Sequence, residues 1–370
     1  PTGTLGQVIR IFRTGAHANR TPLSYPALAP LFARHVQQVA RPDQADLYLF
    51  AHKLDIEAAP RALVEDWRRR RRPVVLMSEE PFWDTIWGRR PLSRDIVLDS
   101  AHGALPVIQL THATSDIFRF DAIPYYLLTH HRFANAYAAR FTRNARLGAA
   151  DWRARFADYA HDLTFMFERR PEAFHAMRWP EGDIIGLCSW RTELAEACTA
   201  GTVRRLGKSW QGGASRFDLD NWHLDKITRL DGTTRMLAAI ENTHQPDYIT
   251  EKLFDAFACG AWPVYFASPR HRVHELDLPD GSWLNLFDLT APEAAGRIAQ
   301  SGFTPPDPDA YATAQIRLAD RFGNPGIWVA ERARLQAAVL DALHRVLDGA
   351  GSGKAPMSDP VSESVPEPVS

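Results

Sequence analysis

The chain has 370 residues, of which 45% are hydrophobic and 24% are charged, as is typical of a soluble globular protein with a sizeable core. This length predicts about two domains. A formal net charge of −1 gives no overall field to hold nucleic acid or an anionic membrane, so no nucleic-acid partner is expected. No apolar run is long enough to cross a membrane and the first residues do not resemble a signal peptide, so we expect a cytoplasmic protein without a transmembrane segment.

The first half of the chain alternates short apolar runs with helical patterns. It predicts strands at residues 8–12, 46–51, 74–78, 96–98 and 107–111, and helices at 26–39 and 60–70. Such alternation is typical of an α/β domain. We therefore expect an N-terminal α/β domain over residues 1–150, followed by a helical connection over 151–180.

The second half continues the same alternation. It predicts strands at residues 183–188, 203–206, 236–240 and 262–267, and helices at 191–199 and 249–259. The helix before Gly260 and its flanking strands form one βαβ unit of a parallel sheet, because Gly tolerates the left-handed turn that ends a helix. We expect a second α/β domain over 181–305 and C-terminal helices over 306–348. Residues 349–370 are rich in Gly, Ser, Pro and Glu, which predicts a disordered tail.

The cysteines and acidic residues give no sign of a metal site. Cys188, Cys198 and Cys259 lie in apolar segments without paired spacing, which predicts small buried side chains rather than disulfides or zinc ligands. Residues 218–220 read Asp-Leu-Asp, a spacing used by metal-binding motifs, but no apolar strand leads into them. We interpret them as a loop and expect no metal.

The polar loop before the helix at 249–259 is the strongest candidate site. Ligands of parallel sheets bind where strands end and helices begin, and a helix N-terminus attracts phosphate. Lys252 adds a positive charge there, Glu251 can accept hydrogen bonds from a ribose, and Tyr248 can pack on a base or a sugar. The structural alternative is that Thr250 caps the helix, Glu251 favours its dipole and Lys252 is solvated.

The same segment resembles a family signature. Glu-Asn-Thr at 241–243, Asp-Tyr-Ile-Thr-Glu-Lys at 247–252 and Pro-Val-Tyr at 263–265 resemble the donor-site motif of the α-1,3-fucosyltransferases, glycosyltransferase family ten, and the absence of an anchor suggests a bacterial type. The resemblance implies that Tyr248, Glu251 and Lys252 bind GDP-fucose. It also implies a fold of the GT-B type, with two Rossmann-like α/β domains facing a cleft.

The resemblance implies further donor contacts. Arg191 stands near the start of a helix in the second domain, where the family has an arginine on the diphosphate, and its planar guanidinium can hold two phosphate oxygens. Asn242 is expected to stabilise the loop or contact the sugar. The implied reaction is inverting transfer of fucose from GDP-fucose to a hydroxyl of an N-acetylglucosamine-containing oligosaccharide or glycoconjugate, with no cofactor. The alternatives are a transferase for another nucleotide-sugar and an inactive glycan-binding relative.

Inverting transfer also needs a base that takes the proton from the acceptor hydroxyl. Glu79 and Glu80 follow the predicted strand at 74–78, so they are placed at the carboxyl edge of the first sheet. The family has a Glu shortly before a Pro after such a strand, and Glu79 fits that spacing to Pro81. We predict Glu79 as the base, with Glu80 as the alternative.

Overall fold

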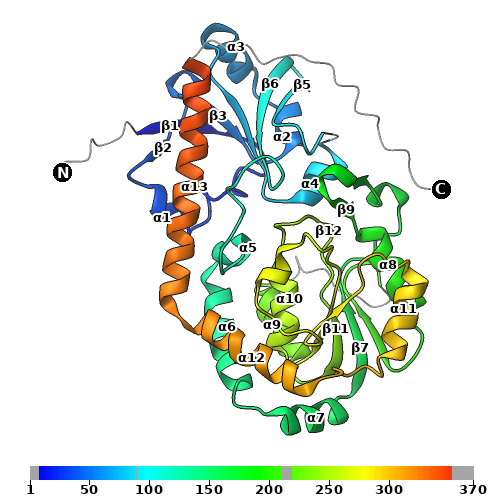
Figure 1. Ribbon diagram of the computed structural model, residues 1–370. Helices are drawn as coiled ribbons and strands as arrows, with labels where there is room; N and C mark the ends of the chain where they lie inside the picture. Colours follow the sequence, from blue (N-terminus) through cyan, green and yellow to red (C-terminus); the bar gives the residue numbers. More distant parts are fainter. Residues whose placement is uncertain (1–7, 89, 211–218, 352–370) are drawn as a thin grey trace. The chain divides into compact units, whose positions relative to one another are not determined.

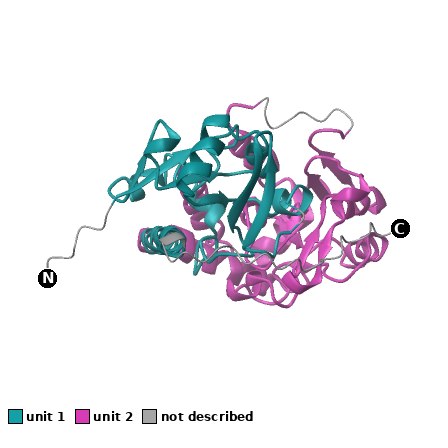
Figure 2. Cartoon of the chain, turned by 90° about the horizontal axis from the view of Figure 1, so that it is seen from above, with its two compact units in different colours: residues 1–130, 329–366 teal, residues 131–328, 367–370 magenta. Residues whose placement is uncertain are grey.

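The computed structural model describes residues 8–88, 90–210 and 219–351. The chain forms two compact units, and each is described by itself (Figure 2). Unit 1 contains the chain up to His130 together with the segment from Val329 onward, and unit 2 contains His131–Trp328. The units therefore divide the chain at residue 130, whereas the sequence placed a domain boundary at 150. The expected tail overlaps the last helix by three residues, and residues 352–370 lie outside the described ranges.

Unit 1 is built on a six-stranded sheet (Figure 1). Its order is β2-β1-β3-β4-β6-β5, and all neighbours are parallel except β5 and β6. The bounds are β1 Ile9–Arg13, β2 Val36–Gln38, β3 Leu47–Phe50, β4 Val74–Met77, β5 Asp95–Ser100 and β6 Gly103–Leu110. Every residue of β3 and β4 is buried, as expected for central strands of a sheet with both faces covered.

Short helices follow these strands. They are α1 Ala29–Phe32, α2 Lys53–Glu57, α3 Arg61–Arg70, α4 Pro81–Ile86 and α5 Tyr125–Leu128. The last helix, α13 Pro325–Gly351, contributes its residues from Val329 to unit 1, where the Gln336 side chain donates a hydrogen bond to the Leu31 carbonyl. The Glu331 carboxylate accepts hydrogen bonds from three successive backbone N–H groups at 121–123, which fixes the loop before α5.

The predicted helix at 26–39 is wrong. The structure has only the four-residue α1 there, followed by β2, which pairs in parallel with β1. Pro26 and Pro30 favour a short helical start, but Val36 and Val39 are β-branched and flank two glutamines in a pattern that suits an edge strand. The segment therefore completes the edge of the sheet instead of covering one of its faces.

Unit 2 is built on a five-stranded, fully parallel sheet in the order β10-β7-β11-β13-β14. The strands are β7 His161–Met166, β10 Val203–Leu206, β11 Thr234–Ala238, β13 Trp262–Tyr265 and β14 Leu284–Asn285. The accompanying helices are α6 His131–Asn144, α7 Ala149–Asp158, α8 Cys188–Ala197, α9 Trp222–Leu230, α10 Glu251–Ala258, α11 Ala291–Gln300 and α12 Pro308–Gly323. The two units together confirm the predicted fold class, α/β with Rossmann-like parallel sheets; the cleft between them stays a prediction.

The βαβ unit around the candidate loop is confirmed. β11 and β13 pair in parallel, with Met236 opposite Trp262, and α10 connects them. Gly260 has φ of +71°, the left-handed conformation that ends α10. A Cβ atom there would lie 2.9 Å from the Tyr159 hydroxyl, so close packing also favours glycine.

Two segments of unit 2 differ from the prediction. Residues 151–180 were expected to form a helical connection, but 161–166 form β7, the strand next to both β10 and β11. The strand expected at 183–188 is β9, Ile184–Gly186, which lies outside the parallel sheet. It pairs antiparallel with β8, Arg178–Trp179, and with β12, Thr243–His244. Strand length explains both errors, because runs of three to six residues carry little periodicity.

Candidate active site

A buried carboxylate, that of Glu241, connects the two ends of the loop between β11 and α10. Glu241 is buried, and its Oε1 accepts hydrogen bonds from the backbone N–H and the hydroxyl of Thr250, both at 2.8 Å. Its Oε2 lies 2.7 Å from Lys252 Nζ. Burial raises the pKa of Glu241, while the Lys252 charge opposes that rise. Glu241, Thr250 and Lys252 therefore form one contact set that ties the end of β11 to the first turn of α10.

Most of this polar loop is buried. Tyr248 is 3% exposed, and Glu251 is buried as well. Lys252 remains the more accessible group, with 21% of its side chain exposed and its Nζ also 3.8 Å from Glu251 Oε1. The Asn242 carbonyl accepts a hydrogen bond of 2.9 Å from the backbone N–H of Leu187, so the loop is joined to the start of α8.

Arg191 lies at the point where the strand order of unit 2 reverses. The chain passes from β7 to β10 on one side and then to β11 on the other, so the carboxyl ends of β7 and β11 flank the switch point at which such sheets bind ligands. Arg191 Nη1 donates to the Ile240 carbonyl just after β11 at 3.2 Å, and its guanidinium lies 4.6 Å from the centre of the Phe167 ring just after β7. Arg191 is 5% exposed, and its Nε has no hydrogen-bond partner among the described residues.

The structure therefore brings four predicted donor-site residues to one edge of the unit 2 sheet. Arg191 contacts Ile240, the loop that begins there carries Asn242, and α10 after that loop starts with Glu251 and Lys252. Tyr248 belongs to the same loop, but its ring is buried in the protein. Arg191 and Lys252, beside the N-terminus of an eight-residue helix, are groups of the kind that hold a phosphate.

A buried charge network behind this edge was missed by the sequence analysis. Asp255 on α10 is fully buried and contacts Lys226 Nζ at 2.8 Å, His223 Nε2 at 2.8 Å and the Tyr137 hydroxyl at 2.7 Å. Burial acts to raise the pKa of Asp255, but the charges of Lys226 and His223 outweigh it and hold that pKa at about 2. Lys226 Nζ also lies 3.9 Å from Glu251 Oε1. The signal that could have found this network is Asp255 itself, an acidic residue among the apolar residues of the predicted helix.

Glu79 lies at the carboxyl edge of the unit 1 sheet, as predicted, but its carboxylate is already engaged. It is 4% exposed and accepts hydrogen bonds from Arg20 Nε at 2.6 Å, the Tyr25 hydroxyl at 2.5 Å and the Tyr125 hydroxyl at 2.7 Å. Burial and the Glu79 charge both raise the pKa of Tyr25, so this phenol remains a donor. A proton on Glu79 would leave Arg20 without its main counter-charge.

The acidic groups next to Glu79 differ from the predicted pair. Arg20 stands between the two glutamates, because its Nη2 lies 3.8 Å from Glu80 Oε2 while its Nε bonds to Glu79. Asp84 on α4 was not predicted. Burial, with the Glu80 charge, raises the pKa of Asp84 to about 8, so this carboxyl is protonated at neutral pH.

A second group of ring side chains lies at the same edge of unit 1. His17 follows β1, His52 follows β3, and their rings stack with centres 4.5 Å apart. Trp83 on α4 packs against both, at 5.3 Å from His17 and 4.6 Å from His52. Arg20 covers the Trp83 indole at 4.9 Å. Sequence reasoning missed this group because its members are separated by 30 residues or more along the chain.

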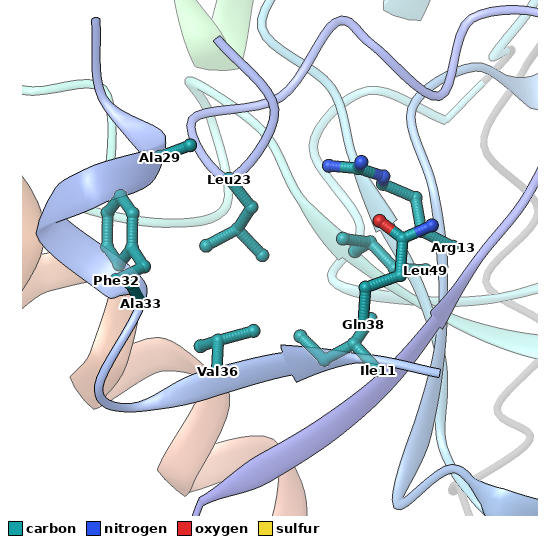
Figure 3. Close-up of a pocket in the computed structure, with 9 residues that line it drawn as sticks. All are labelled: Ile11, Arg13, Leu23, Ala29, Phe32, Ala33, Val36, Gln38 and Leu49. Atoms are coloured by element: carbon teal, nitrogen blue, oxygen red, sulfur yellow. The ribbon is translucent and has the colours of Figure 1, made fainter. Parts of the chain in front are cut away.

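Unit 1 also has a cavity of about 200 Å³ (Figure 3). It is lined by Ile11, Arg13, Leu23, Ala29, Phe32, Ala33, Val36, Gln38 and Leu49. Its lining is mainly apolar, and no predicted site residue contributes to it. Within residues 8–88, 90–210 and 219–351, no group of three or more His, Cys, Asp or Glu side chains is placed to hold a metal ion. Across the same ranges, no helix is long and apolar enough to span a membrane.

The two parallel sheets and their helices define an α/β protein, and the unit 2 edge that carries Arg191 and Lys252 is its candidate ligand site. Residues 207–300 match the model of "Glycosyltransferase family 10 (fucosyltransferase) C-term". This match covers Asn242, Tyr248, Glu251 and Lys252, and it confirms the predicted family resemblance and the enzyme class, a glycosyltransferase. Arg191 and Glu79 lie outside the matched segment.

Two solved structures match most of the chain at low sequence identity. A crystal structure of α1,3-fucosyltransferase with GDP-fucose has 12% sequence identity and a TM-score of 0.44, with 94% of this chain and 93% of that chain covered. The Anabaena protein HepE in complex with UDP and glucose has 11% identity and a TM-score of 0.41, with 91% and 100% covered. No curated protein matches the chain.

Proposed function

We propose that the protein transfers L-fucose from GDP-fucose to a hydroxyl of an N-acetylglucosamine-containing glycan, with inversion at the anomeric carbon and without a metal. The observation that carries the proposal is the match of residues 207–300 to a fucosyltransferase domain, which includes Glu251 and Lys252 at the start of α10. The acceptor oxygen attacks the anomeric carbon, the bond to the β-phosphate breaks, and GDP leaves with the electron pair.

The donor half of the reaction is assigned to the charged edge of unit 2. Arg191 and Lys252 hold the diphosphate and stabilise the negative charge that develops on the leaving group. When the donor binds, the Lys252 ammonium contacts a phosphate oxygen and moves partly away from Glu241. Glu251, held at 3.9 Å from Lys226, accepts hydrogen bonds from the ribose. Asn242 and Tyr248 shape the loop against the nucleotide or the fucose.

The acceptor half is assigned to the carboxyl edge of unit 1. The family resemblance implies Glu79, with Glu80 as the alternative, as the proton acceptor. The three donors on Glu79 weigh against that role, because a general base needs a free lone pair in reach of the hydroxyl proton.

Nucleotide-dependent stabilisation tests the donor assignment. A ligand at one hundred times its Kd stabilises the folded state by about 2.7 kcal/mol, which raises Tm by a few degrees. We expect GDP to raise Tm in a thermal-shift assay, and UDP and ADP to have little effect at the same concentration. Selective stabilisation by UDP would contradict the guanine assignment and favour a transferase for another nucleotide-sugar. No response to any nucleotide would favour a glycan-binding protein.

A further inference from the structure

Two acidic residues stand one turn apart on α10, a helix whose other residues are mostly apolar. Glu251 and Asp255 are four residues apart, so their side chains lie on the same side of the helix. Both are buried, with Asp255 0% and Glu251 6% exposed. Like charges at this spacing repel, and burial strengthens the repulsion because the interior screens charge less than water does. The two carboxylates therefore need a cation between them.

Lys226 of α9 is that cation. Its Nζ lies 2.8 Å from Asp255 Oδ2 and 3.9 Å from Glu251 Oε1, and only 9% of its side chain is exposed. Burial acts to lower the pKa of Lys226, but the charges of Asp255 and Glu251 outweigh it and raise that pKa above its ordinary value. Lys226 is therefore a constant positive charge at neutral pH, placed beside Glu251 and shielded from solvent.

Further contacts hold Asp255 and the first turn of α10 in place. The Tyr137 hydroxyl donates to Asp255 Oδ1 at 2.7 Å and lies 3.3 Å from the Glu251 carbonyl oxygen. His223 Nε2 lies 2.8 Å from the same Asp255 oxygen. These contacts join α6, α9 and α10, which all belong to unit 2. Lys226 is thus anchored to a carboxylate that is itself fixed from two other helices or turns.

Lys252 is the second cation beside Glu251, and it differs from Lys226 in exposure. Its Nζ lies 3.8 Å from Glu251 Oε1 and 2.7 Å from Glu241 Oε2, and 21% of its side chain is exposed. Burial acts to raise the pKa of Glu251, but the charges of Lys252 and Lys226 together lower it. In the proposed reaction Lys252 turns toward the diphosphate. Lys226 then remains as the charge that keeps Glu251 ionised.

Stability alone does not account for a buried lysine at this position. A buried ion pair contributes little net stability, because removing two charges from water costs about as much as their attraction contributes. Apolar residues at 226 and 255 would fill the same space without that cost. What Lys226 adds is its contact with Glu251, the first residue of α10 and the residue to which the ribose is assigned.

The ionised state of Glu251 determines how well it can bind a ribose. An ionised carboxylate is an acceptor at both oxygens, whereas a protonated one uses one oxygen as a donor. Hydrogen bonds to a charged acceptor are also about twice as strong as those between neutral groups. Loss of the Lys226 charge would therefore weaken the contact between Glu251 and ribose hydroxyls, although Lys226 itself does not touch the ligand.

We propose that Lys226, fixed by Asp255, is a positioning residue that keeps Glu251 ionised and in place to accept hydrogen bonds from the 2′- and 3′-hydroxyls of the donor nucleotide. This inference rests on the proposed function, in which Glu251 contacts the ribose. It gives the donor site a preference for a ribonucleotide over its dideoxy analogue. It also assigns part of that preference to a side chain behind the site.

The test measures Kd by calorimetry for GDP and for 2′,3′-dideoxy-GDP, which lacks both ribose hydroxyls. We expect the wild type to bind GDP about 10- to 100-fold more tightly, the usual effect of hydrogen bonds to a charged group. Lys226→Met removes the charge at similar length. It should lower this ratio to about threefold or less, by weakening GDP and leaving the dideoxy analogue nearly unchanged. The control Arg229→Met, which changes an exposed residue of the same helix, should keep the wild-type ratio.

Two double variants show whether Lys226 acts through Glu251. Lys226→Met alone leaves the Asp255 charge without its partner, whereas Lys226→Met with Asp255→Asn removes both charges and keeps an acceptor for Tyr137. This double variant should show the same reduced ratio. Lys226→Met with Glu251→Gln should lower the ratio no further than Glu251→Gln alone, because residues that act in one contact are not additive.

The outcomes separate this inference from the proposed function. A wild-type ratio in Lys226→Met and in its double variant with Asp255→Asn would overturn the inference. Equal weakening of GDP and dideoxy-GDP would also overturn it, because that is the effect of a purely structural role. A wild type that releases GDP from GDP-fucose but binds both nucleotides equally would overturn the inference and leave the proposed function intact. A wild type that binds neither nucleotide and releases no GDP would contradict the proposed function itself.

Discussion

Replacement of Arg191 with alanine should lower kcat/KM for transfer from GDP-fucose by about 100- to 1,000-fold, the usual effect of removing one preorganised donor from a developing anion. Arg191 sits at the switch point of the unit 2 sheet, with one nitrogen on the Ile240 carbonyl and a buried Nε that has no partner among the described residues. Buried N–H groups are nearly always paired, so a ligand oxygen is the expected partner. The Kd for GDP, measured by calorimetry, should rise by about tenfold or more.

Arg205 provides the matched control for this prediction. Arg205 also donates hydrogen bonds to backbone carbonyls in unit 2. Its Nε donates to the Ala195 carbonyl at 2.6 Å, and its Nη2 donates to the Cys198 carbonyl at 2.7 Å. Its alanine variant should lose stability but keep its affinity for GDP. Arg191→Lys keeps the positive charge but lacks the planar guanidinium. Its affinity for GDP should lie between those of the wild type and the alanine variant. Equal GDP affinity in the wild type and Arg191→Ala would remove Arg191 from the donor site.

Asp255→Asn should destabilise the protein by about 3–5 kcal/mol, the cost of leaving a buried charge without its partner. Lys226 has 9% of its side chain exposed and would lose a contact of 2.8 Å, while His223 and Tyr137 would lose a charged acceptor. The free energy of unfolding in urea measures this change. Arg229→Gln on the same helix α9 breaks the exposed pair with Asp225 and should cost less than about 1 kcal/mol.

The effect of Asp255→Asn should depend on pH with a definite sign. The pKa of Asp255 in the folded protein is about 2, below its ordinary value of 3.8. The charge of Asp255 therefore stabilises the folded state above about pH 4, and this contribution is lost as pH falls toward 2. The difference in stability between the wild type and Asp255→Asn should shrink over that range. A difference that stays constant from pH 6 to pH 2 would mean that the charge of Asp255 is not what stabilises the network.

The helices and strands with a clear hydrophobic periodicity were predicted from the sequence, and those with a weak periodicity were missed. The run Leu253–Phe257 has clear helical spacing, and Gly260 ends it, so α10 and its βαβ unit were predicted correctly. β7 was missed because its apolar core spans only 163–166, although it is the strand on which the order of the sheet depends. Residues 36–38 were assigned to a helix because the pairing of β2 with β1 is a long-range contact that no local pattern reports.

The candidate site shows the same limit. Glu251 and Lys252 are neighbours in a recognisable string, so the sequence could place them at a helix start. The link between that loop and Arg191 depends on the reversal of strand order, which appears only when the sheet is assembled. His17 and His52, whose rings stack, lie on different loops of unit 1, and no spacing rule joins them. The engagement of Glu79 by three donors is equally invisible in the sequence.

GDP-fucose is the proposed donor. The most direct measurement incubates the full chain separately with GDP-fucose, GDP-mannose and UDP-glucose, together with N-acetylglucosamine-containing oligosaccharides, and analyses the products by mass spectrometry. We predict that the acceptor gains the mass of one deoxyhexose with GDP-fucose and is unchanged with the other two donors. Hexose transfer from UDP-glucose, or an unchanged acceptor and no GDP release with GDP-fucose, would contradict the claim.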